Sequence, residues 1–198
     1  MQSSRMDGRS LVTGSVVGFA AWLFGYAFTY AIVAPDIRES PLNQFVEMFE
    51  GASPTYEMVG WVFYNAHFVD IVFRDIPFVG SRSGTFIGGQ DGFTTLLYVI
   101  PPLLLLAAGL ALSRHQRAAT PSDGARFGLA VIPSYLVLSV AGAFLFDVTA
   151  LGASGAPDLL PAVVIAGVVY PVVFASVGGA VGGFLERRDR TADVQPRR

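Results

Sequence analysis

Four long apolar segments alternate with polar segments along this chain of 198 residues. A helix that crosses a membrane needs about 20 consecutive, mostly apolar residues, and each segment reaches that length. The segments cover residues 11–34, 94–113, 127–146 and 159–185. This pattern predicts an all-α membrane protein: a single integral membrane domain over residues 1–198, built as a bundle of four transmembrane helices.

The longest polar insertion, residues 35–93, predicts a helical cap between the first and second spans. Ser40 followed by Pro41 is typical of a helix N-terminus. Apolar residues then recur on one helical face. They are Leu42, Phe45, Val46 and Phe49, and Gly51 ends this helix.

A second cap helix is expected over residues 56–73, which are rich in aromatic side chains. The segment also contains polar residues that are costly in hydrocarbon. They are Glu57, Asn65, His67 and Asp70. We therefore expect this helix to lie at the outer membrane interface and not to form a fifth span. The Gly-rich segment 76–93 is compatible with a small hairpin that turns at residues 81–84.

The charged residues sort between the polar segments. Arginines dominate the two ends of the chain and the segment between the second and third spans: Arg5, Arg9, Arg114, Arg117, Arg126, Arg187, Arg188, Arg190, Arg197 and Arg198. Acidic residues dominate the cap: Asp36, Glu39, Glu47, Glu50, Glu57, Asp70, Asp75 and Asp91, against Arg38, Arg74 and Arg82. The positive-inside rule then predicts both termini in the cytoplasm and an extracellular cap.

Composition narrows the range of functions. The chain is 53% hydrophobic and only 14% charged, whereas soluble domains carry roughly a quarter charged residues. It has no cysteine, which excludes disulfides and thiolate metal sites. There is no phosphate-binding loop, no HExxH motif, no nucleophile elbow and no basic-aromatic surface. We therefore expect no cofactor, no metal, no catalytic residue and no nucleic-acid partner.

Small residues recur four apart in two spans, a spacing that lets helix backbones approach closely. Gly14 and Gly18 form the pair in the first span. On the last span, Ala175, Gly179 and Gly183 form one series, and Gly178 and Gly182 form another. The sequence leaves two interpretations open, which are packing within this chain's own bundle and an interface with a second copy or another membrane protein.

His67 and Asp70 are three apart and are expected to share one face of the second cap helix. We expect a structural role, in which the imidazole bonds Asp70 or a nearby loop carbonyl. The alternative is a metal or acid–base site.

The interiors of the four spans contain no Asp, Glu, Arg or His, although ion-coupled carriers usually place ionisable groups there. Prolines lie in the last three spans and can bend a helix or frame a gate. The alternative function therefore left open is a small transporter or channel with an uncharged path.

Three stretches resemble a family of small multi-pass membrane proteins from halophilic archaea. They are VGWVFYNAHFVD at residues 59–70, YVIPP at 98–102 and VYPVVF at 169–174. Members of that family are uncharacterised and are sometimes loosely labelled transporters. The resemblance implies a haloarchaeal origin and transfers no activity and no catalytic residue.

These observations favour a non-enzymatic protein of the cell membrane that acts by assembly. Its expected partners are the lipid bilayer and either further copies of itself or the other subunits of a membrane-protein complex. A membrane-embedded enzyme using His67 and Asp70 is the remaining hypothesis.

Overall fold

The computed structural model describes residues 8–78, 80–90 and 92–193. The fold is mostly helical, at 73%. It divides into two compact units, and several helices contribute to both. Unit 1 comprises Met1–Trp22, Pro102–Leu136 and Val168–Arg198, and unit 2 comprises Leu23–Pro101 and Val137–Gly167. Of the charged residues named above, Arg5, Asp91, Arg197 and Arg198 lie outside the described residues.

Four helical segments of the described chain are long and apolar enough to cross a membrane, which confirms the sequence prediction on this point. They are Gly8–Glu39, Thr95–His115, Pro121–Leu145 and Leu159–Thr191. The first, α1 (Gly8–Glu39), continues beyond the predicted end at residue 34 and includes Pro35. The last contains two π-helical segments, η3 (Ala162–Val169) and η4 (Pro171–Ala175), around a proline that has no N–H to donate.

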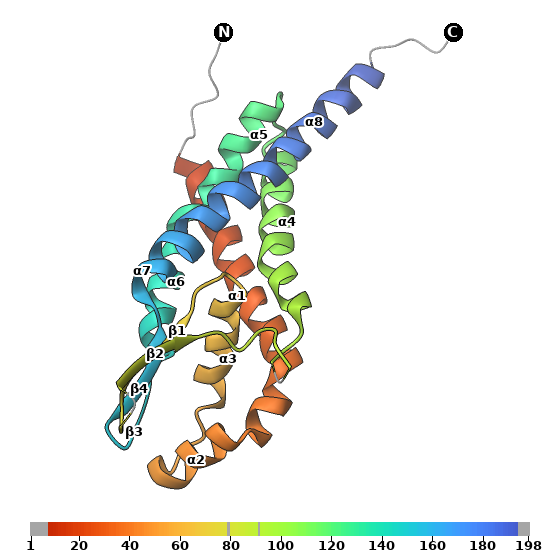
Figure 1. Cartoon of the computed structure of the whole chain (residues 1–198). Helices are drawn as coiled ribbons and strands as arrows, with labels where there is room; N and C mark the ends of the chain where they lie inside the picture. The colour runs from red at the N-terminus through yellow and green to blue at the C-terminus, as the bar shows by residue number, and fades with distance from the viewer. Residues whose placement is uncertain (1–7, 79, 91, 194–198) are drawn as a thin grey trace. The chain divides into compact units, whose positions relative to one another are not determined.

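Unit 1 is a cluster of packed helices. Its elements include α4 (Ile100–His115), α5 (Pro121–Gly128), η2 (Leu129–Val131) and α8 (Ser176–Asp193). The helices α5 and α8 lie side by side (Figure 1). Thr120 caps α5, because its hydroxyl accepts a hydrogen bond from the Asp123 amide at 3.2 Å and Pro121 follows it.

Unit 2 contains the cap helices α2 (Pro41–Glu50) and α3 (Thr55–Asn65). The helix α2 begins and ends at the signals in the sequence. The Ser40 hydroxyl accepts a hydrogen bond from the Asn43 amide, and Gly51 takes a left-handed conformation with φ of 74°. Unit 2 also contains η1 (Thr95–Val99), α7 (Leu159–Pro161) and part of α6 (Ile132–Leu145).

The second cap helix is shorter than the sequence predicts, because α3 ends at Asn65 and not at residue 73. The Asn65 side chain reaches forward along the chain and donates a hydrogen bond to the Val69 carbonyl at 2.8 Å. Phe68 has a positive φ of 58°, which ends the helical path. The β-branched pair Ile71 and Val72 then starts a strand.

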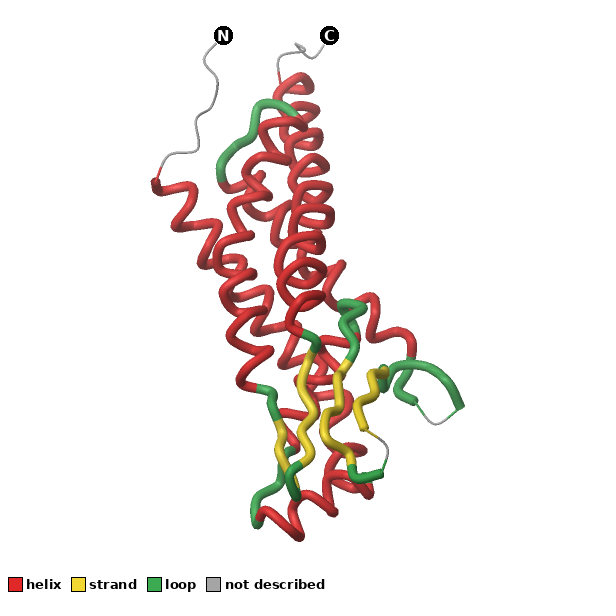
Figure 2. Tube along the Cα trace, turned by 60° about the vertical axis from the view of Figure 1, so that its left-hand side comes forward, coloured by secondary structure: helices red, strands yellow, loops and turns green. Residues whose placement is uncertain are grey.

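A small antiparallel sheet corrects the all-α prediction. Its strands are β1 (Ile71–Ile76), β2 (Gly80–Gly84), β3 (Val148–Ala150) and β4 (Ala153–Pro157). Within the described residues their order is β2-β1-β4-β3, and Figure 2 shows the strands side by side in yellow. The hairpin expected to turn at residues 81–84 was wrong, because residues 80–84 form the strand β2, which pairs with β1.

The second hairpin, β3–β4, was not predicted. Its two turn residues, Leu151 and Gly152, have φ of 52° and 83°, the signs that a type I′ turn requires. The β4 strand also pairs with β1. The Asp158 amide N–H donates a hydrogen bond to the Asp70 carbonyl oxygen at 2.9 Å. This pairing ties the segment before α7 to the end of the α3 turn.

Aromatic side chains of α3 form the core of unit 2. Trp61, Phe63 and Tyr64 are each at most 2% exposed. The Trp61 indole N–H donates to the Phe146 carbonyl at 2.7 Å, and the Tyr64 hydroxyl donates to the Ser139 carbonyl. These bonds satisfy the polar atoms that the aromatic core buries.

Candidate functional site

The glycines of the first span lie against α6 and the turn before it, within unit 1. A Cβ built on Gly14 would overlap Ala130, and one on Gly18 would lie 2.5 Å from the Val131 carbonyl oxygen and the Ser134 hydroxyl. Both positions therefore require glycine, because real Cβ atoms do not approach neighbours so closely.

The two small-residue series of the last span face two different helices of the same chain. Gly179 lies against the Gly124 backbone, and Gly183 lies against the Thr120 carbonyl. The Ala175 carbonyl lies against Gly109 and Gly128. One series therefore borders α5, with Ala175 reaching α4 as well.

The second series borders α4. Gly178 lies against the Leu106 carbonyl, and a Cβ on Gly182 would lie 2.8 Å from the Ser113 Cβ. Both series thus serve close packing within unit 1. Sequence reasoning missed the facing glycines Gly109, Gly124 and Gly128. Gly124 and Gly128 are four apart in α5, but the predicted third span began at residue 127 and so separated them, and Gly109 has no such partner in α4.

His67 and Asp70 do not share a helix face, because both lie beyond the end of α3. His67 is 1% exposed, and its Nδ1 lies 2.8 Å from the Phe63 carbonyl oxygen, which identifies Nδ1 as the protonated nitrogen. Asp70 is exposed, and its backbone carbonyl accepts the bond from Asp158. Among the residues that the structure describes, no group of three or more His, Cys, Asp or Glu could hold a metal ion.

Burial lowers the pKa of His67 from 6.5 to about 4, and the bond to the Phe63 carbonyl opposes this shift. The folded protein therefore keeps a neutral imidazole where the unfolded chain binds a proton, and stability falls as the pH drops from 6.5 towards 4. At 1.36 kcal/mol per pKa unit, the loss amounts to roughly 3 kcal/mol.

We expect His67→Gln to flatten this part of the stability curve. The check is the difference in thermal stability between variant and wild type in detergent across pH 4 to 7. The variant should be less stable near neutral pH and gain relative to wild type on acidification. His115→Gln removes an exposed histidine and serves as the control. A difference that does not change with pH contradicts the assignment.

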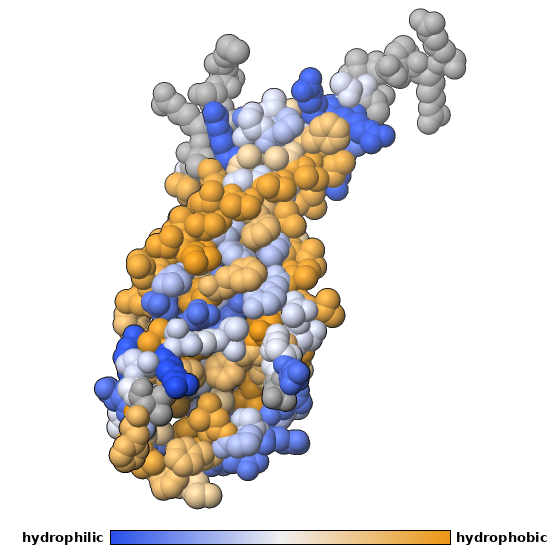
Figure 3. Space-filling view, viewed as in Figure 1, coloured by the Kyte–Doolittle hydropathy of each residue, from blue (hydrophilic) through white to orange (hydrophobic). Residues whose placement is uncertain are grey.

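The helix α2 exposes most of its apolar face. Val46 is buried, whereas Phe45 is 45% exposed, Met48 78% and Phe49 51%. The rings of Phe45 and Phe49 lie 4.8 Å apart. Apolar side chains also gather over α2 at the lower end of the view in Figure 3.

The opposite side of α2 is anchored. The Asn43 side chain donates to the Thr55 hydroxyl at 3.0 Å and accepts from the Ser53 hydroxyl at 3.0 Å. The Leu151 amide donates to the Glu50 carboxylate at 3.3 Å. The exposed apolar face, formed by Phe45, Met48 and Phe49, is therefore held in a defined orientation within unit 2.

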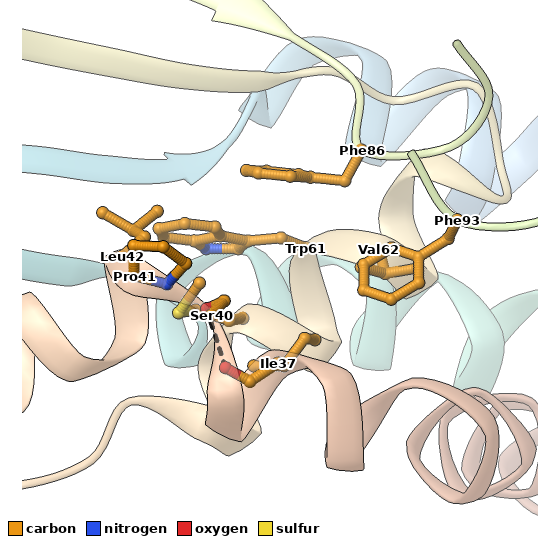
Figure 4. Close-up of a pocket in the computed structure, with 9 residues that line it drawn as sticks. Ile37, Ser40, Pro41, Leu42, Trp61, Val62, Phe86 and Phe93 are labelled. Atoms are coloured by element: carbon orange, nitrogen blue, oxygen red, sulfur yellow. Dashed lines mark hydrogen bonds between the residues drawn. The ribbon is translucent and has the colours of Figure 1, made fainter. Parts of the chain in front are cut away.

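Two apolar cavities adjoin Trp61 within unit 2. The first, of about 290 Å³, lies between the end of α1, the start of α2, α3 and the loop that carries Phe86 and Phe93. The second, of about 330 Å³, lies between α2 and the sheet. Leu42 and Trp61 line both cavities. Figure 4 shows the first cavity, with the Phe86 ring over the Trp61 indole.

Two described side chains with polar atoms that line the first cavity, Ser40 and Trp61, already have hydrogen-bond partners. The Ser40 hydroxyl donates to the Ile37 carbonyl at 2.7 Å, and the indole N–H is bound to Phe146. Phe86 stacks on Trp61 with ring centroids 5.8 Å apart. Sequence reasoning missed this site, and the density of aromatic residues over 56–73 was its only signal.

A family model described as a family of unknown function (DUF7978) matches residues 1–186. No curated protein and no solved structure matches the chain. The match agrees with the expected membership of an uncharacterised family.

Proposed function

The chain belongs to this family of unknown function, and from that premise we propose a non-enzymatic protein of the cell membrane that acts by assembly. Its four long helices cross the membrane, both termini lie in the cytoplasm, and the cap of residues 35–93 lies outside. There the exposed face of α2 binds a second membrane protein. The haloarchaeal origin is part of the proposal and rests on the resemblance described above.

The surfaces of the long helices support the membrane location. Large apolar side chains are exposed on all four: Val12, Val16, Phe24 and Phe28 on α1, Leu96 and Leu103 on the second helical segment, Val137 and Phe144 on the third, and Val164, Val173 and Phe184 on the last. Contiguous apolar surface of this kind is unfavourable in water and favourable against lipid tails.

The arginine-rich side supports the orientation. Arg190 donates to the Arg117 carbonyl at 2.9 Å and lies 3.5 Å from Glu186. Arg114 lies 3.5 Å from Asp189. These contacts gather the basic loop between α4 and α5 with the end of α8, as expected for a cytoplasmic cluster of positive charge.

The exposed face of α2 is the observation that carries the assembly proposal. This face is apolar, and α2 lies outside the four candidate spans, the first of which ends at Glu39. The exposed acids Glu39 and Glu47 border the face. In a symmetric dimer each patch meets itself, so these acids would oppose one another. A partner with basic residues around an apolar patch fits better than a second copy.

The test places a photo-crosslinking amino acid at Met48 and, as control, at Arg82, which is exposed on β2 and does not lie on α2. After irradiation of native membranes, we expect an adduct of Met48 with one other membrane protein and none at Arg82. An adduct of twice the chain's mass, a lipid adduct alone, or no adduct contradicts the proposal.

A further inference from the structure

We propose that unit 2 binds the hydrocarbon chain of a membrane lipid in the two apolar cavities that share Leu42 and Trp61. This site adjoins the exposed face of α2 at Phe45, which lines the second cavity, whereas Met48 and Phe49 line neither cavity. The inference goes beyond assembly with a partner protein and names a small-molecule ligand.

The chemistry of the walls selects hydrocarbon. The shared wall, Leu42 and Trp61, presents methyl, methylene and ring carbons. The Trp61 indole N–H and the hydroxyl of the neighbouring Ser40 are already bound. A ligand with a polar group at this depth would lose its hydrogen bonds to water without gaining others. A hydrocarbon chain loses none.

Water gains little along the walls of these cavities. A water molecule needs two to four polar partners, and the apolar walls offer few. A hydrocarbon chain that covers the same walls removes apolar surface from water, which is favourable. The open apolar space therefore favours a hydrocarbon ligand over water.

The volumes select a chain and exclude a helix. One water-sized group occupies roughly 30 Å³, so each cavity has room for about ten methylene-sized groups. A single helical turn, about 5 Å long and 10–12 Å across, already exceeds either volume of about 290 or 330 Å³. A flexible chain is the partner that fits.

The surroundings supply an entrance and a place for the polar end. The second cavity is lined by three exposed side chains, Leu42, Phe45 and Leu151, so its apolar space opens to the surface. Leu42 also lines the first cavity. Beside the first cavity lies a more polar depression that shares Ser40, Phe86 and Phe93 with it. Asp36 and Thr94 line that depression, where a lipid headgroup meets polar atoms.

Trp61 is itself the reporter for the test. The chain has two tryptophans, so Trp22→Phe leaves Trp61 as the single source of indole emission. This variant is reconstituted in vesicles of dioleoyl-phosphatidylcholine or of its dibrominated form, whose bromines quench nearby indoles. We expect the brominated lipid to reduce Trp61 emission.

A matched pair of variants on the β3–β4 hairpin tests whether the quenching lipid lies in the second cavity. Ala153 lines the second cavity, and Ala153→Phe fills part of it. Thr149 lies on the same hairpin between the lining residues Val148 and Ala150, so its side chain points to the other face of the sheet. We expect Ala153→Phe to reduce the quenching and Thr149→Phe to leave it unchanged.

Quenching that Ala153→Phe leaves unchanged means that the whole cap meets the bilayer, and it overturns the proposal, as does an absence of quenching. If Trp22→Phe fails to fold, mass spectrometry of lipid retained by the otherwise unaltered chain, with and without Ala153→Phe, decides the same question. Retention that falls in the variant supports the cavity site, and equal or no retention overturns it. The Met48 crosslink reports separately on the partner protein.

Discussion

Gly179→Leu is expected to disrupt unit 1. A Cβ at this position already overlaps the Gly124 carbonyl oxygen, and Gly124 in turn lies against the Gly179 backbone. The two helices must separate to admit the leucine, and neither backbone can rotate away as a side chain would. A substitution that overpacks a core usually costs about 1–3 kcal/mol of stability. We expect Gly179→Leu to cost at least the upper end of that range, because here two backbones are in contact.

The measurement is thermal unfolding in detergent, together with the yield of monodisperse protein. Val181→Leu is the control, since Val181 lies on the same helix and is 45% exposed. We expect a large fall in stability for Gly179→Leu and a change within about 0.5 kcal/mol for the control. A variant that keeps wild-type stability would show that α5 and α8 are not in contact at these glycines.

Trp61→Ala should produce the largest effect in unit 2. The side chain is 2% exposed, and Phe73 and Phe86 pack on it with ring centroids 5.5 and 5.8 Å away. Removing a buried aromatic side chain of this size costs about 3–5 kcal/mol. The exposed Met48→Ala is the control, and the readout is again thermal stability in detergent.

Trp61→Phe distinguishes the contribution of aromatic packing from that of the indole hydrogen bond. Phenylalanine keeps aromatic packing against Phe86 but leaves the Phe146 carbonyl without the indole donor. The loss of one buried hydrogen bond costs about 0.5–1.5 kcal/mol. We therefore expect an intermediate loss of stability. Equal stability of Trp61→Phe and wild type would show that the carbonyl finds another donor.

The long helices could be predicted from the sequence because length and hydropathy alone define them. The end of α3 could not, because it depends on the Asn65 side chain reaching the Val69 carbonyl and on the positive φ of Phe68. From the sequence we extended the helix to residue 73 and therefore expected His67 and Asp70 on one helix face. Both residues lie after the end of α3.

The sheet was missed for a related reason. The strand β4, ASGAP, has little β propensity and pairs with β1 about eighty residues earlier, so no local pattern reveals it. The second cavity beside Trp61, which residues of β1 and β4 help to line, depends on the same long-range pairing. The small-residue series were visible, whereas their partners Gly109, Gly124 and Gly128 were identified only by the packing.

We propose a membrane protein whose cap lies outside the cell and whose basic loop, between α4 and α5, lies inside. The absence of cysteine allows a direct measurement with single substitutions at two exposed serines, Ser83→Cys in the cap and Ser122→Cys at the start of α5. A membrane-impermeant maleimide should label Ser83→Cys on intact cells and should label Ser122→Cys only after lysis. Labelling of Ser122→Cys on intact cells, or none of Ser83→Cys, would contradict the account.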